Sequence, residues 1–193
     1  MMSSQHGSAL PNRNAPFVLD ARALNRAPGS MREEHRVVSA PSRMGLDMIA
    51  IDKGRDVTLD LRLESVSEGI LVTGTVSSIA SGDCVRCLEP MDLDVEVPIT
   101  ELFAYPHSVT SATTEEEEIY RLIDDLIDLE PVVINGLGLE LPLQPLCSED
   151  CPGLCTDCGV PIASAEPDHG HDTIDPRWSG LLDKMGSADS SKN

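Results

Sequence analysis

Apolar and polar residues alternate through the middle of this 193-residue chain, as they do in strands with one buried face. From Val57 to Leu63 every second residue is apolar. A stretch rich in β-branched residues, 70–79, follows a Glu68-Gly69 turn, and the alternation then returns at Leu93, Val95, Val97 and Ile99. The pattern predicts an antiparallel meander of at least three strands over residues 57–105.

Helical spacing is found after the meander. The residues that recur with this spacing are Leu129, Val132, Val133, Leu137 and Leu141. We expect a helix there, although Pro131, Gly136 and Gly138 are poor helix formers. A second, short helix is expected near the C-terminus, where Asp175-Pro176 precedes Trp178 and Leu182.

Less regular segments surround these elements. Residues 17–19 suit a short strand or anchor, and residues 22–41, which Pro28-Gly29 divides, are expected to form a partly ordered lead-in. The segment 106–118, with its run of glutamates, is predicted to be a solvated acidic loop. The polar, aperiodic residues 1–15 and 186–193 are predicted to be disordered tails.

These elements fit a single domain over residues 16–182, since domains cluster at about 100 to 150 residues. Aromatic residues make up only 3% of the chain, so Leu, Ile and Val must fill the core. The expected fold class is α+β. It consists of an antiparallel β meander or partly closed barrel, a packed helix, and a C-terminal zinc-binding, cysteine-rich segment over residues 147–171.

Net charge and hydropathy restrict where the protein acts and what it binds. No stretch reaches the roughly 18 consecutive apolar residues of a membrane helix, and residues 1–11 lack a basic, apolar leader, so we expect a cytoplasmic protein. In a reducing compartment, six cysteines favour metal ligands or catalytic thiols over disulfides. A net charge of -19 repels phosphate and disfavours direct nucleic-acid binding, whereas it favours a basic protein partner.

The cysteines fall into three pairs, which are Cys84-x2-Cys87, Cys147-x3-Cys151 and Cys155-x2-Cys158. A Cys-x2-Cys turn can direct two sulfur atoms at one metal ion, as in zinc knuckles. His169-Gly170-His171 follows at a distance typical of the second half of a zinc site. The eight side chains suffice for two closed tetrahedral zinc sites.

Two ligand pairings are compatible with this spacing. The preferred one places Cys84, Cys87, Cys147 and Cys151 on one zinc ion and Cys155, Cys158, His169 and His171 on another. In the rival pairing, Cys147, Cys151, Cys155 and Cys158 bind a single ion and the first pair stays free. The first pair could also be two buried thiols beside a turn, and the histidines could belong to a solvated loop.

Closed sites argue against catalysis, because a catalytic zinc ion keeps one position for water. The chain also lacks the His-Glu-x-x-His helix of zinc proteases, the signature of zinc deaminases, a phosphate-binding glycine loop and a Gly-x-Ser-x-Gly elbow. We therefore expect a protein that is not an enzyme.

Several segments together resemble the bacterial YceD family, whose members are described as large-subunit ribosomal RNA accumulation proteins. The resemblance runs from about Phe17 to Leu182. It depends on the segments Cys84-Val85-Arg86-Cys87-Leu88-Glu89-Pro90, Ile127-Asp128-Leu129, Leu141 to Gly159 and Ile174-Asp175-Pro176-Arg177-Trp178. Relatives usually have a glycine-free helix before the cysteines, so Gly136 and Gly138 make the length of that helix here an open point.

The resemblance implies a non-enzymatic role in building the large ribosomal subunit. In many bacteria the family is encoded beside a small zinc-ribbon ribosomal protein, and some members that lack the Cys155-Cys158 pair keep a counterpart of the first, which favours the preferred pairing. We expect contact with a basic ribosomal protein or a large-subunit precursor. The alternatives are a zinc-thiolate redox sensor and a direct ribosomal RNA binder, which the few aromatic residues disfavour.

Overall fold

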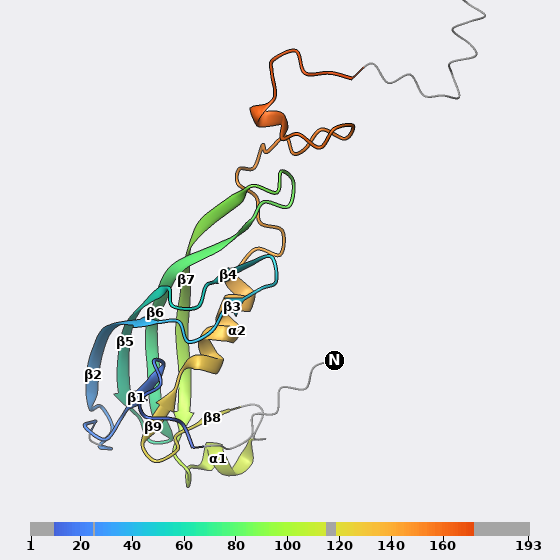
Figure 1. Cartoon of the computed structure of the whole chain (residues 1–193). Coiled ribbons are helices and arrows are strands. Elements are labelled where there is room, and N and C mark those ends of the chain that lie inside the picture. The colour runs from blue at the N-terminus through green and yellow to red at the C-terminus, as the bar shows by residue number, and fades with distance from the viewer. Residues whose placement is uncertain (1–9, 25, 115–118, 172–193) are drawn as a thin grey trace, which may run out of the picture.

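A computed structural model describes residues 10–24, 26–114 and 119–171 of the chain. The described part is mostly antiparallel β-sheet with few helices (Figure 1). The main sheet is formed by β2 (Met31–Ser39), β3 (Met44–Gly45), β4 (Ile49–Ile51), β5 (Asp56–Ser65), β6 (Gly69–Asp83), β7 (Pro90–Ala104) and β8 (Tyr120–Arg121). The other elements are β1 (Val18–Asp20), α1 (Val109–Thr113), β9 (Leu126–Asp128), α2 (Glu130–Glu140) and the 3-10 helix η1 (Ile162–Ser164).

The predicted meander is confirmed. Strands β5, β6 and β7 follow one another along the chain and pair antiparallel, so that Gly74 of β6 lies between Leu61 of β5 and Ile99 of β7. The alternating apolar residues of β5 all lie on the buried face, as their period of two requires. They are Val57, Leu59, Leu61 and Leu63.

The β6–β7 hairpin is longer than the rest of the sheet. These two strands pair along their full 15-residue lengths, whereas β5 pairs only with residues 70–77 of β6. Further along, the short strand β4 pairs with residues 81 and 82. The hairpin therefore extends beyond the body of the molecule and carries its turn, residues 84–89, away from the main core (Figure 1).

Helix α2 lies against β7 and confirms the predicted helix. It buries Val132, Val133 and Leu137 and runs through Gly136 and Gly138 without a break. The two-stranded sheet of β1 and β9 adds further apolar side chains to the same core. The prediction of a short strand near residue 18 is therefore also confirmed.

The predicted partial barrel was wrong, because the main sheet is not closed. Among the described residues, β2 pairs only with β5, and β8 pairs only with β7, in parallel. The inner face is covered by α2 and by side chains of β1 and β9. Since these elements bury the apolar face, the sheet needs no closing strand to shield it.

Two segments are more regular than expected. Residues 31–39, placed in a partly ordered lead-in, form the nine-residue strand β2. Its exposed residues alternate with half-buried ones, and three of the half-buried ones, Arg32, Glu34 and Arg36, are charged. This pattern suits an edge strand, and local apolar periodicity does not reveal it. The segment 106–118, predicted to be a loop, contains the single turn of α1, which Ser108 caps through its side chain.

Other predictions fall on residues that the structure does not describe. These are most of the tail 1–15, the glutamate run 115–118, the helix expected near Asp175 and the tail 186–193. Within the described ranges, no helix is long and apolar enough to span a membrane.

Candidate metal centres

The first candidate centre lies at the tip of the β6–β7 hairpin. The turn between these strands provides Cys84 and Cys87, and the segment after α2 provides Cys147 and Cys151. The four Sγ atoms lie within 4.8 Å of one another. The Cys84 and Cys151 sulfurs are 3.8 Å apart, and those of Cys87 and Cys147 are 3.7 Å apart.

The backbone of the turn directs both of its sulfur atoms to one side. The Cys84 N–H donates to the Glu89 carbonyl (2.9 Å), and the Leu88 N–H donates back to the Cys84 carbonyl (2.8 Å). Backbone N–H groups of Cys147, Cys87 and Arg86 hydrogen-bond to the Cys84 sulfur and lower the pKa of its thiol to about 6. One thiolate is thus favoured at neutral pH before any metal binds.

Polar contacts fasten the turn to the C-terminal segment independently of the cysteines. The Val85 N–H donates to the Pro145 carbonyl (2.9 Å). The Arg86 guanidinium donates through Nη1 to the carbonyls of Glu149 and Cys151, both at 3.1 Å. Sequence reasoning missed this role of Arg86. The signal available was that only Arg86 and Arg121 are basic between positions 86 and 171.

Burial makes the first centre part of the protein interior. Cys84, Cys87 and Cys151 are buried, while Cys147 is exposed. Met91 and Leu146 pack around them, and the cluster is separate from the main core. So small an apolar cluster gives little stability on its own, since only a few side chains leave water there.

Close thiols cannot all be charged without a cation. The neighbouring sulfurs of Cys151 and Cys87 raise the pKa of the Cys147 thiol to about 12, although the residue as a whole is exposed. A divalent cation would remove this repulsion and bind all four as thiolates. The group therefore could hold a metal ion.

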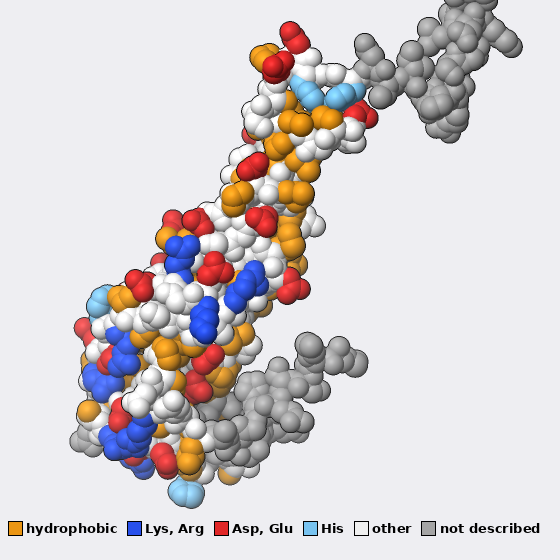
Figure 2. All heavy atoms as spheres, in the orientation of Figure 1, with side chains coloured by type: hydrophobic (Ala, Val, Ile, Leu, Met, Phe, Trp, Pro, Cys, Tyr) orange, Lys and Arg blue, Asp and Glu red, His pale blue; other side chains and the backbone are white. Residues whose placement is uncertain are grey.

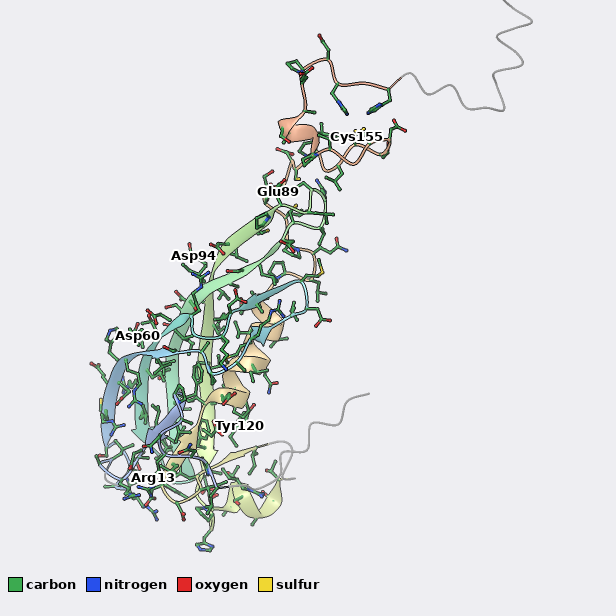
Figure 3. The ribbon with its side chains drawn as sticks, viewed as in Figure 1. Arg13, Asp60, Glu89, Asp94, Tyr120 and Cys155 are labelled. Carbon is green, nitrogen blue, oxygen red and sulfur yellow. The ribbon has the colours of Figure 1, made fainter. Side chains whose placement is uncertain are left out.

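The second candidate centre lies further along the chain and is open to solvent. It consists of Cys155, Cys158, His169 and His171, whose ligand atoms lie within 4.8 Å of one another. The Cys158 sulfur is 3.4 Å from His169 Nε2, and the Nε2 atoms of the two histidines are 3.3 Å apart. Figure 3 shows Cys155 and Glu89 at the end of the molecule opposite Arg13.

The turn at Cys155 repeats the backbone of the turn at Cys84. The Cys155 N–H donates to the Val160 carbonyl, and the Gly159 N–H donates to the Cys155 carbonyl, both at 2.8 Å. Hydrogen bonds from the N–H groups of Asp157 and Cys158, and then from His169, lower the pKa of the Cys155 thiol to about 6. The residue after the second cysteine is left-handed in both turns, with φ 60° at Leu88 and φ 74° at Gly159.

The structure thus brings together the same two sets of four residues as the preferred pairing. It does not join Cys147 and Cys151 to Cys155 and Cys158, as the rival pairing would require. Either set could hold a metal ion. That these side chains act as ligands stays a prediction.

The fold and the clusters define a β-rich protein with two candidate metal centres. The chain belongs to the YceD family, described as large ribosomal RNA subunit accumulation protein, and the family match covers residues 72–183. This range includes both cysteine turns and both histidines. The family description implies a role in the accumulation of large-subunit ribosomal RNA.

Similar proteins occur in several bacteria. The uncharacterized protein Rv2926c of Mycobacterium tuberculosis is 53% identical over 187 residues, which cover 96% of this chain and 90% of that protein. The uncharacterized protein ML1660 of Mycobacterium leprae is 44% identical over 171 residues, 89% of this chain and 78% of that protein. YlbN of Bacillus subtilis is 27% identical over 130 residues, 67% of this chain and 70% of that protein. No solved structure matches the chain.

Proposed function

We propose that this protein is a non-enzymatic ribosome biogenesis factor that supports large-subunit ribosomal RNA accumulation by binding a basic ribosomal protein. The observation that carries the proposal is the separation of charge along the chain. Residues 1–86 contain ten acidic and ten basic side chains, whereas residues 87–171 contain 19 acidic and one basic. Such a field attracts a positively charged partner and repels bare RNA.

The surface follows the same division. In Figure 2, basic side chains are seen over the body of the molecule, whereas acidic ones are seen at its far end. Arg86 lies at the first metal centre, where its guanidinium is hydrogen-bonded to the carbonyls of Glu149 and Cys151. Strand β7 presents a row of exposed carboxylates to solvent, at Asp92, Asp94 and Glu96. The acidic part of the chain thus includes the outer strand of the long hairpin as well as the cysteine-rich segment.

We further propose that both centres hold zinc. With Zn–S distances of about 2.3 Å, a tetrahedral site places sulfurs about 3.8 Å apart, and with Zn–N distances of about 2.05 Å it places nitrogens about 3.3 Å apart. The Sγ pairs of the first centre are 3.8 and 3.7 Å apart, and the two imidazole Nε2 atoms of the second are 3.3 Å apart. Sets of four sulfurs or of two sulfurs and two nitrogens are typical zinc ligands.

Both proposed zinc sites are structural. Each has four protein ligands and so leaves no position for a reactive water. The first would join a hairpin turn to a segment 60 residues further along, from Cys87 to Cys147, and thereby stabilise a region with little core of its own. Four thiolates around Zn²⁺ also carry a charge of about -2, which adds to the acidic character. We place the protein in the cytoplasm, together with the partner it binds.

A binding experiment tests the proposed partner. Immobilised protein is offered proteins extracted from large ribosomal subunits, freed of RNA, and separately the large-subunit RNA. We expect basic proteins to be retained at about 0.1 M salt and largely released at about 0.5 M, because salt screens exposed charges. Retention of RNA without any ribosomal protein would contradict the proposal.

Charge-neutralised variants sharpen this test. Asp94→Asn with Glu96→Gln removes two exposed carboxylates from the acidic part of the chain. Glu33→Gln with Asp47→Asn removes two exposed carboxylates from the charge-balanced part and serves as the matched control. We expect only the first pair of changes to lower the association rate at low salt.

A second candidate function is a redox sensor, favoured by the exposure of the second centre. Cys158 is exposed and Cys155 partly so. Hydrogen peroxide could oxidise their two thiolates to a disulfide, and with two protons it would be reduced to two water molecules while the metal ion is released. If partner binding is the same before and after peroxide treatment that releases this metal, the sensor function is excluded.

A further inference from the structure

Helix α2 has apolar residues on its outer side as well as its inner side. Its inner residues pack in the core, but Ile134 is 42% and Leu139 87% exposed. Large apolar side chains on a helix normally face the core or another element. Within the part of the chain that the structure describes, the outer side of α2 is therefore an unpartnered helix face at Ile134 and Leu139.

This apolar surface continues beyond the helix. In the segment that leads from α2 to the first metal centre, Leu143 is 80% exposed. Figure 2 shows hydrophobic side chains following this flank of the molecule towards the metal centres. Exposed apolar surface with a polar rim typically marks a protein interaction site.

Leu88 lies in the turn that the Val85 N–H joins to the Pro145 carbonyl of this same segment, and its backbone geometry is unfavourable. It is 61% exposed and has φ 60°, a conformation that costs a non-glycine residue energy. The equivalent position of the second turn is Gly159, which avoids this cost. A large side chain kept in a strained, solvent-exposed position indicates a function outside the fold.

We propose that Ile134, Leu139, Leu143 and Leu88, here called the apolar flank, form the docking surface for a basic and partly apolar segment of a protein partner. The inference rests on the proposed function and names the surface used. Charge complementarity selects the occupant, because the flank belongs to the part of the chain with 19 acidic residues and one basic one. Carboxylates adjoin it along the chain at Glu89 and Glu140. Apolar anchors inside a charged rim are the usual anatomy of a protein interface.

The test uses the full-length, metal-loaded chain and proteins extracted from large ribosomal subunits. A double variant, Leu139→Ser with Leu143→Ser, changes two residues that are mostly in solvent, so the fold and the metal content should not change. Val109→Ser, at a 69% exposed apolar residue of α1, is the matched control. We expect the double variant to raise the Kd for the retained protein at least about tenfold. The control should have a Kd within about twofold of that of the unaltered chain.

The outcomes separate the docking surface from the function on which it rests. If the unaltered chain retains no ribosomal protein, the proposed function fails, and the flank fails with it. If the unaltered chain and the double variant bind equally tightly, the apolar flank is not the docking surface, while the proposed function stands. A variant ending at His171 that binds much more tightly than the full chain would show that residues 172–193 occupy the flank, which would also overturn the proposal.

Discussion

Gly136 of α2 lies directly against Val97 of β7, so that Val97 Cγ1 fills the space that a Cβ at position 136 would need. A glycine that weakens helix propensity is thus what allows the helix to approach the sheet. Gly138, two residues further along, has no atom within 4 Å of the corresponding position. The two glycines therefore differ in role although they are neighbours in one helix.

Alanine substitutions should separate these roles. We expect Gly136→Ala to lower the free energy of unfolding by about 1–3 kcal/mol, because the added methyl overpacks the contact with Val97. Gly138→Ala should raise it by about 0.5–1 kcal/mol, since alanine favours the helix and nothing opposes its methyl. Urea unfolding of the metal-loaded protein measures both. Equal stability of the two variants would refute the proposed packing.

A substitution at Gly159 should affect the second centre. Gly159 has φ 74°, so Gly159→Ala strains the turn by about 1 kcal/mol or more. Gly170 also adjoins the ligands but has no positive φ and only an ordinary contact near its Cβ position, so Gly170→Ala is the control. With a chelator, metal should leave the Gly159→Ala variant faster than the control. Identical release rates would mean that the turn is not held in the form described.

Metal should leave the two centres in a fixed order. Three of the four cysteines of the first centre are buried, whereas Cys158, His169 and His171 of the second are exposed. Arg86 also clamps the first centre through two carbonyls. Because a chelator reaches exposed ligands first, we expect two phases of release with a colorimetric chelator. The fast phase should vanish in Cys155→Ser and the slow phase in Cys84→Ser, and the reverse assignment would contradict this account.

The folding stability of the metal-free protein should depend on pH through two thiols. The pKa values of the Cys84 and Cys155 thiols are each lowered from 9.0 to about 6 by hydrogen bonds from backbone N–H groups. The largest contribution comes from the N–H of Cys147 for Cys84 and from that of Asp157 for Cys155. A lowered pKa stabilises the folded state above pH 9, and this contribution is lost as the pH falls from about 9 to about 6. The pKa of Cys147 is raised to about 12, so that thiol destabilises the fold only above pH 9.

We therefore expect the stability of the metal-free, reduced protein to rise between pH 6 and pH 9. Urea unfolding at four pH values in this range measures the slope. Cys84→Ser and Cys155→Ser should each reduce it, because each removes one of the two thiols. A slope that is the same in both variants and in the unaltered chain would exclude the stabilised thiolates.

Much of the site could be predicted from sequence because its signals are local. The period-two apolar pattern located β5 and β7, and the spacing of Cys84-x2-Cys87 and Cys155-x2-Cys158 indicated the two turns. Each signal depends on only a few neighbouring residues, so tertiary structure did not have to be known. The choice between two ligand pairings could not be made from spacing alone, since it depends on how the hairpin approaches the segment after α2.

The features that could not be predicted depend on contacts between distant segments. Strand β2 lacks an apolar face, and its pairing with β5 becomes visible only in three dimensions. The sheet stays open because α2 and side chains of β1 and β9 cover its inner face, a matter of packing rather than of strand periodicity. The contact between Gly136 and Val97 explains why this helix has a glycine at position 136, and it cannot be inferred from neighbouring residues alone.

The central claim is that two closed zinc sites, one of them joining the hairpin turn to the C-terminal segment, complete this fold. Its most direct test is the zinc content of the native protein, measured by elemental analysis and native mass spectrometry beside the Cys84→Ser and Cys155→Ser variants. We predict two zinc ions in the unaltered chain and one in each variant, with the remaining ion in the other centre. A chain that is folded, free of metal and unaffected by chelators would contradict the account.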